Sequence, residues 1–319
     1  MKAAKNTLFY KVISLFIKSL ILFLSFYYIW DKLQQSSVVF DFPHLFSSDN
    51  KIYTITIFLL MFVNWSLEAF KWKLLIAPLE LITFSSSLKG IFSGVTISIF
   101  TPNRVGEFAG RVFFLEKADK IKASIMSIIG SVIQLSVTII AGVIAYFILK
   151  KMQFNVFQVE HFYSLKALYL LLALVFIVTA FLVFVILNRK TTFISIKKNI
   201  EIMNVYSKKE LSSAFCISVF RYIVFSIQYY LALRLFGING GLIISFSLIA
   251  LTFFVTSAIP TFALTEIAVR AGVAIYFFGT ICSVHSSILA ASLFLWIINL
   301  AIPALIGSGF VWKLKLNKL

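Results

Sequence analysis

The sequence predicts an all-α polytopic membrane protein, with about six full transmembrane helices and two oppositely oriented, broken re-entrant hairpins in an inverted repeat. Three observations support this fold. The 319-residue chain is 61% hydrophobic and only 13% charged, which is more apolar surface than a soluble fold of this size could bury. Several apolar runs reach the ~20 residues that cross a bilayer. Two further apolar segments are interrupted by proline beside charged residues.

Six apolar runs are long enough to be full spans. They occupy approximately residues 11–30, 52–70, 124–149, 164–187, 211–236 and 286–311. The first follows a basic start but has no cleavage site of small residues before Asp31, so we interpret it as an uncleaved span. The connections are too short for a globular domain, and residues 1–319 are therefore expected to form one integral membrane domain.

The distribution of basic residues predicts the orientation. The net charge is +17, and the lysines and arginines gather before the first run, in the connection 188–210 and in the C-terminal tail. Six spans place these regions on one side, which the positive-inside rule assigns to the cytoplasm. We therefore expect a protein of the cytoplasmic (inner) membrane with both termini in the cytoplasm, and the charge does not point to a nucleic-acid partner.

Two apolar segments end at a proline. Residues 93–100 run into Thr101-Pro102-Asn103-Arg104-Val105-Gly106, and residues 243–259 run into Pro260. Proline lacks the N–H that a helix interior needs and disfavours helical geometry in the residue before it. Each helix is therefore predicted to break near its proline, with Asn103 and Gly106 contributing to the first break.

Each break is followed by the pattern Glu-x-Ala-x-Arg. Glu107 pairs with Arg111 in the first copy and Glu266 with Arg270 in the second, and a spacing of four places each pair on one helix face. A restarted helix also presents a positive dipole end to an anion. We expect Arg104, Glu107, Arg111, Glu266 and Arg270 to bind substrate. Alternatively, the short similarity arises by chance and the pairs lie at helix ends near the headgroups.

The order of the runs orients the two hairpins. Residues 88–117 lie between spans that end and begin in the cytoplasm, whereas residues 241–279 lie between spans that meet at the outer face. The units 52–150 and 211–310 are therefore expected to repeat with inverted topology. Many transporters place a binding site near the midplane between such interrupted helices.

Other polar residues give weaker signals. Gln134, Arg221 and Gln228 lie in apolar runs. Arg221 is close enough to the inner interface to snorkel, and the alternative role of Gln134 is to join helices. The 3 histidines and 2 cysteines lack metal-ligand or disulfide spacing, so we expect no metal, no cofactor and no disulfide framework. No phosphate-binding loop is present.

Residues 101–107, Thr-Pro-Asn-Arg-Val-Gly-Glu, resemble the Thr-Pro-Gly-Arg-x-Gly-Glu type signature of the lysylphosphatidylglycerol synthase/flippase transmembrane-region family. The resemblance covers most of the chain, and Pro260 and Glu266 match the family's later proline-containing segment. Asn103 replaces the usual glycine, and residues 261–265 lack the glycines common there. The resemblance implies an integral membrane protein that binds or translocates phospholipids or a related polyisoprenyl lipid or glycolipid. The soluble synthase domain of bifunctional members is lacking here, so we expect no enzymatic activity.

Three functions remain open at this point. The leading hypothesis is a flippase-like protein that binds or translocates an anionic phospholipid or a related lipid-linked substrate. Arg104, Arg111 and Arg270 would hold the headgroup, with Glu107 and Glu266 as counter-charges or proton acceptors. A secondary transporter of a small anion would use the same hairpins. A non-transporting accessory subunit of a lipid or glycan assembly system would depend instead on the basic connection.

Overall fold

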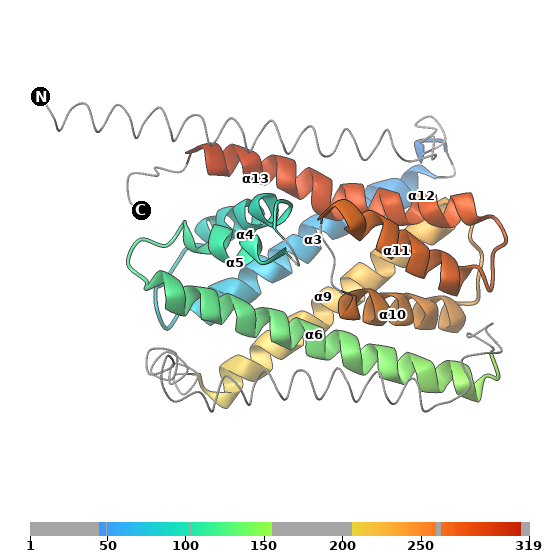
Figure 1. Ribbon diagram of the computed structural model, residues 1–319, viewed down its shortest axis with the longest axis horizontal. Helices are drawn as coiled ribbons and strands as arrows, with labels where there is room; N and C mark the ends of the chain where they lie inside the picture. The colour runs from blue at the N-terminus through green and yellow to red at the C-terminus, as the bar shows by residue number, and fades with distance from the viewer. Residues whose placement is uncertain (1–44, 49, 102–103, 155–205, 260–262, 314–319) are drawn as a thin grey trace, which may run out of the picture.

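The computed structural model describes residues 45–48, 50–101, 104–154, 206–259 and 263–313 (Figure 1). These residues form helices and connections, with no β-strand among them. The principal elements are α3 (Lys51–Ile76), α4 (Phe84–Ser98), α5 (Gly106–Val112), α6 (Lys120–Lys151), α9 (Lys208–Leu235), α10 (Leu242–Ala258), α11 (Ala263–Phe278), α12 (His285–Trp296), the π-helix η3 (Ile297–Ala301) and α13 (Ile302–Lys313).

Four helices within the described residues are long and apolar enough to cross a membrane. They are α3, α6, α9 and the continuous helix His285–Trp312, which joins α12, η3 and α13. They confirm four of the six predicted runs as helices. The runs at 11–30 and 164–187 lie outside the residues that the structure describes. The protein is therefore an integral membrane protein built from α-helices.

Two apolar helices are too short to cross a membrane. α4 has 15 residues and α10 has 17, and at 1.5 Å per residue neither reaches the ~30 Å of a hydrocarbon core. They end at Ser98 and Ala258, shortly before Pro102 and Pro260, as the proline rule predicts. Pro102, Asn103 and Pro260 themselves lie outside the described residues.

The chain turns back after each stop and forms a second helix. The pair α4 and α5 lies at one end of the long axis, and the pair α10 and α11 lies at the other (Figure 1). Gly106 begins α5, and a Cβ atom there would lie 2.8 Å from the Ile97 carbonyl oxygen. The first break therefore requires glycine at this position.

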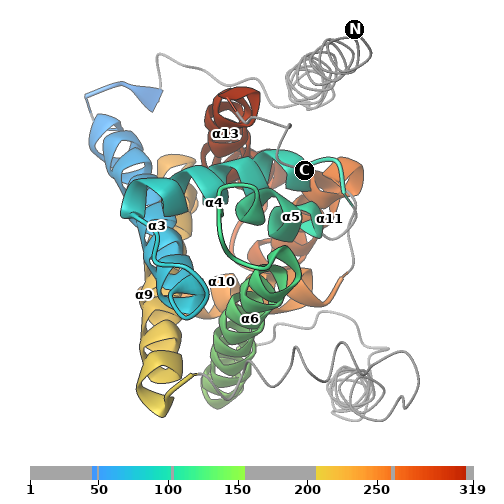
Figure 2. The same ribbon diagram turned by 90° about the vertical axis from the view of Figure 1, so that its left-hand side faces the viewer.

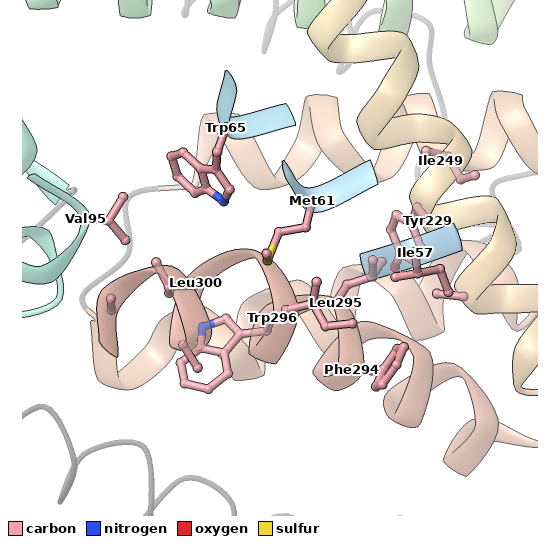
Figure 3. Close-up of a cluster of buried hydrophobic side chains, with 14 of the residues drawn as sticks. Ile57, Met61, Trp65, Val95, Tyr229, Ile249, Phe294, Leu295, Trp296 and Leu300 are labelled. Atoms are coloured by element: carbon pink, nitrogen blue, oxygen red, sulfur yellow. The ribbon is translucent and has the colours of Figure 1, made fainter. Parts of the chain in front are cut away.

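The helices of the two halves pack against each other crosswise. α3 packs on α9, α4 on α13, and α6 on α10. Figure 2 views the molecule from the end at which α4 and α5 lie. The shared core joins Ile57, Met61 and Trp65 of α3 to Leu295 and Trp296 of α12 (Figure 3). These contacts hold the two short hairpins between the long helices.

A π-turn interrupts the last spanning helix directly before Pro303. The Ile302 N–H donates to the Ile297 carbonyl five residues earlier, which is the π pattern. Proline has no N–H and its ring crowds the carbonyl four residues before it. The wider turn accommodates Pro303 without ending the helix, and it carries Asn299 toward the molecular centre.

We predict that Gly307→Ala lowers stability. A Cβ atom at Gly307 would overlap the Phe92 carbonyl oxygen and Thr96 Oγ1 of α4. Forcing this crossing apart is expected to cost about 1–3 kcal/mol. The matched control is Gly309→Ala, two residues along the same helix, where a Cβ atom meets nothing within 4 Å. Thermal unfolding of the purified protein should show a lower midpoint for Gly307→Ala only, and equal midpoints would contradict the close packing of α4 on α13.

Glu80 fastens the connection after α3 to the turn before α6. Its carboxylate accepts from the backbone N–H groups of Lys117 and Ala118 at 2.8 Å and of Glu116 at 3.1 Å. Partial burial disfavours the charged form, but these donors and the Lys117 charge outweigh it and hold the pKa of Glu80 below its ordinary value of 4.5. The folded state therefore binds this proton less readily than the unfolded state.

Because the pKa of Glu80 is lower in the folded state than in the unfolded state, we predict a pH-dependent effect of Glu80→Gln on stability. The stabilisation is fully present above the unfolded pKa near 4.5 and is lost as the pH falls through the lower folded pKa. Glu80→Gln should lower the unfolding midpoint at pH 7, and its difference from the wild type should shrink in acid. A difference that stays constant from pH 7 down to pH values below the folded pKa would show that the carboxylate charge is not the cause.

Candidate functional site

Glu68 lies at the centre of a buried ion cluster. Its side chain is 5% exposed, and one oxygen lies 2.8 Å from Lys71 Nζ on the same helix. Arg111 Nη2 of α5 lies 2.9 Å from the other oxygen, and Arg221 Nη1 of α9 lies 3.1 Å from the first. One carboxylate thus joins α3 to the first hairpin and to the fifth predicted span.

The cluster extends on both sides of Glu68. Arg111 also pairs with Glu107, one turn earlier on α5. Gln134 of α6 accepts from Lys71 Nζ and Arg221 Nη1 at 3.4 Å each, and its amide donates to the Ser218 carbonyl of α9 at 3.3 Å. Gln134 therefore does join helices, and it also solvates two cations inside the apolar layer.

The second predicted pair forms on α11. Arg270 Nη2 lies 2.9 Å from Glu266 Oε1, and the Glu266 side chain is 6% exposed whereas that of Arg270 is 39% exposed. Both Glu-x-Ala-x-Arg copies therefore make their i,i+4 ion pair. They differ in surroundings, since Arg111 is enclosed at 3% exposure and Arg270 opens into a cavity.

A cavity of about 270 Å³ lies between the two hairpin breaks. Arg104 enters it from the first break, Glu266 and Arg270 enter from the second hairpin, and Arg221 enters from α9. Residues of α3, α6, α10 and α12 complete the wall. The two breaks, separated by more than 150 residues in sequence, therefore face the same space.

Arg104 has an unusual backbone. Its φ is 58°, in the left-handed region that non-glycine residues rarely adopt. Its Nε donates to Ser98 Oγ at 3.4 Å, and within the described part of the chain it makes no ion pair. Strained residues of this kind are concentrated at ligand sites. The left-handed backbone places the Arg104 guanidinium at the cavity wall, where its charge acts on the carboxylates of Glu107 and Glu266.

The remaining wall is aromatic and amide-rich. The Arg221 guanidinium lies 5.7 Å from the centre of the Trp65 ring, within cation–π range. Asn299 of the π-turn donates to Gln228 at 3.0 Å, Asn64 donates to Asn299 at 3.4 Å, and Gln228 donates to the Ile57 carbonyl at 2.9 Å. These side-chain amides form a continuous chain of hydrogen bonds along one wall of the cavity.

The structure divides the predicted binding residues into two groups. Arg104, Glu266 and Arg270 line the cavity, whereas Glu107 and Arg111 reach it only through Glu68 and Arg221. The interpretation of Arg221 as a snorkelling residue is wrong for this structure, because its guanidinium pairs with Glu68 inside the protein.

Sequence reasoning missed Glu68 and Lys71. The second predicted run ends at residue 70, whereas α3 continues to Ile76, and Lys71 in this extension is only 1% exposed. The available signal was an acid and a base three residues apart within a largely apolar helix. Such pairs are costly in a bilayer unless they are enclosed, which makes them candidates for a site.

The site carries an excess of positive charge. In their ordinary ionisation states, the cavity and the ion cluster contain five basic side chains and three carboxylates. The bases are Lys71, Arg104, Arg111, Arg221 and Arg270, and the acids are Glu68, Glu107 and Glu266. Two uncompensated positive charges at membrane depth are unfavourable, so the site favours an anionic occupant.

Among the residues that the structure describes, no group of three or more His, Cys, Asp or Glu side chains is placed to hold an ion. Cys216 and Cys282 are free thiols. Guanidinium groups recognise oxyanions by paired hydrogen bonds, so anion binding is the chemistry that these residues offer.

Comparison with known proteins adds one finding. A family model, described as the lysylphosphatidylglycerol synthase TM region, matches residues 12–307. Neither the curated proteins nor the solved structures gave a significant match. The matched range covers both hairpins and all four described spans nearly to their end.

We predict that Glu68→Gln strongly destabilises the protein. It leaves two buried cations, Lys71 and Arg111, and the partly exposed Arg221 without their shared carboxylate. Breaking a buried ion pair costs roughly 3–5 kcal/mol. Thermal unfolding should show a much lower midpoint, and adding Lys71→Met should restore part of it because one unpaired cation is removed. The control is Glu116→Gln, an exposed residue. An unchanged unfolding midpoint for Glu68→Gln would show that the ion cluster does not stabilise the fold.

Proposed function

Because the chain belongs to the lysylphosphatidylglycerol synthase transmembrane-region family, we propose that it binds the headgroup of an anionic phospholipid, or of a related lipid-linked substrate, in its cavity and carries the lipid across the bilayer. The family is associated with lipid synthesis or flipping, and the chain is an integral membrane protein. The observation that carries the proposal is the excess of guanidinium groups around a cavity within the apolar layer.

The three cavity arginines suit a phosphate. Arg104 makes no ion pair within the described residues, Arg270 is 39% exposed, and Arg221 is partly exposed at 21% while it is anchored to Glu68. A phosphodiester offers two charged oxygens, which match the paired N–H donors of a guanidinium. Arg104 and Arg270 are the groups with the most capacity left for a ligand.

Glu266 would act as the counter-charge that allows release. It holds Arg270 at 2.9 Å, so a headgroup phosphate competes with a carboxylate already in place. Such competition weakens binding enough for the substrate to leave again. Glu107 and Arg111 would not contact the substrate and would act as positioning residues. Arg111 pairs with Glu107 and with Glu68, and Glu68 in turn holds Arg221.

The packing is compatible with alternating access by two inverted units. α4 of the first unit packs on α13 of the second, and α10 of the second packs on α6 of the first, while α3 and α9 face each other. This exchange of partners supports the proposed repeat of 52–150 and 211–310. The expected location in the inner membrane, with cytoplasmic termini, would open the first hairpin toward the cytoplasm.

A small soluble anion is the second candidate. The cavity volume of about 270 Å³ lies just below the ~300–1,000 Å³ typical of ligand pockets, a size that suits a lipid headgroup or a free anion equally well. The hypothesis of an accessory subunit depends on the basic connection 188–210, which lies mostly outside the described residues. It stays a prediction from sequence.

We predict that Arg270→Ala abolishes most lipid movement. Losing a charge-assisted hydrogen bond to phosphate removes roughly 1.5–3 kcal/mol, or about 10- to 100-fold in affinity. The test reconstitutes the full chain in vesicles and follows fluorescent phosphatidylglycerol across the bilayer. Arg270→Lys should retain part of the rate, because it keeps the charge but loses the paired donors.

The matched control for this prediction is Arg234→Ala. Arg234 lies in the last turn of α9, outside the cavity lining. Both variants must elute as the wild type does in gel filtration. Unchanged lipid transport by a folded Arg270→Ala protein would show that Arg270 is not part of the binding site. If the protein transports a free anion but no lipid, the second candidate function is favoured.

A further inference from the structure

An apolar groove adjoins the charged cavity. It lies between α6, α9 and α10, and its volume is about 480 Å³. Its rim carries aliphatic side chains, with Ile144 at 54%, Ile223 at 46% and Ile243 at 59% exposure. Its floor carries small side chains, among them Ala145 at 3% and Ala250 at 6%. The groove is therefore an open, apolar channel on the surface of three helices, two of which are long enough to span a membrane.

One side chain belongs to both spaces. Tyr222 lines the groove and also lines the charged cavity, and it follows Arg221 directly in sequence. Its ring packs edge-on against Phe253, with ring centres 5.9 Å apart, and Phe253 also lines the cavity. The cation that pairs with Glu68 is therefore one residue away from the apolar groove.

Close packing limits the groove along α6. A Cβ atom at Gly142 would lie 2.6 Å from Phe254 Cβ, so α6 and α10 approach closely at this level. Ala141 and Ala145, on either side of Gly142 along the helix, line the groove. Gly142 therefore allows close packing of α6 on α10. The side chains of Ala141 and Ala145 are too small to fill the groove.

We propose that this groove holds one hydrocarbon chain of the same lipid molecule whose anionic headgroup occupies the cavity. The proposal rests on the proposed function and specifies its substrate class as an acyl-chain lipid. The volume of about 480 Å³ lies within the range of ligand pockets. A headgroup site and a chain site joined by Tyr222 bind one linked molecule more tightly than two separate ones, because the second contact becomes intramolecular.

The test compares two isoleucine-to-tryptophan changes on one helix. Ile144→Trp fills the groove, and the matched control Ile128→Trp alters an exposed isoleucine of α6 outside both linings. The full chain is placed in phosphatidylcholine nanodiscs. Electron paramagnetic resonance then measures association of phosphatidylglycerol spin-labelled on its chain, and calorimetry measures binding of glycerol 3-phosphate, which has the phosphate but no chain.

We expect Ile144→Trp to weaken phosphatidylglycerol association about tenfold or more, as the loss of a few buried methylene contacts would, and to leave glycerol 3-phosphate binding unchanged. Ile128→Trp should match the wild type in both measurements. Ile243→Trp, on the opposite wall, should repeat the effect and serves if Ile144→Trp does not fold. Wild-type association of phosphatidylglycerol with both groove variants would overturn the groove assignment.

Arg270→Ala alters the charged cavity but not the groove, so it tests the headgroup site separately from the chain site. It should weaken both phosphatidylglycerol and glycerol 3-phosphate, because it removes a headgroup contact. If Arg270→Ala weakens both ligands while the groove variants weaken neither, the cavity stands and the groove assignment falls. If the wild type binds glycerol 3-phosphate but shows no preference for phosphatidylglycerol over phosphatidylcholine, the occupant is a free anion and both proposals for a lipid fail.

Discussion

A carboxylate inside a bilayer is stable only through its partners, and Glu68 has three of them on three structural units. Lys71 comes from its own helix, Arg111 from the first hairpin and Arg221 from α9. Because each unpaired ion at this depth would be unfavourable, the positions of α3, α5 and α9 are tied to one another. The crossing of α3 on α9 and the depth of the first hairpin both follow from this constraint.

The charges around the cavity are divided between two tasks. Arg111 and Lys71 are enclosed, and Glu107 is paired with Arg111, so these three contribute to the arrangement of helices and have little capacity for a ligand. Arg104 and Arg270 are more open, and Arg104 is held there by a left-handed backbone. Arg221 belongs to both groups, since it contacts Glu68 and lines the cavity. It is therefore the residue through which an occupant of the cavity would affect the helix arrangement.

Sequence patterns predicted the features that depend on neighbouring residues. The four described spans follow from apolar length, the stops of α4 and α10 follow from proline, and both Glu/Arg pairs follow from a spacing of four. Contacts between distant residues were not predictable in this way. Glu68 and Arg111 are 43 residues apart, and Asn64 and Asn299 are 235 apart, so no local period reveals them. The inverted repeat and the binding roles remain predictions, because they concern topology and ligands.

The placement of the ion pairs also bears on how the chain enters the membrane during synthesis. Glu68 with Lys71, Glu107 with Arg111, and Glu266 with Arg270 each join residues three or four apart. Each of these carboxylates therefore leaves the ribosome with a basic partner within one helical turn on the same segment. Arg221 is different, because its carboxylate was made more than 150 residues earlier. Its arrival completes the cluster, so lateral assembly of the first half is finished only when α9 has been inserted.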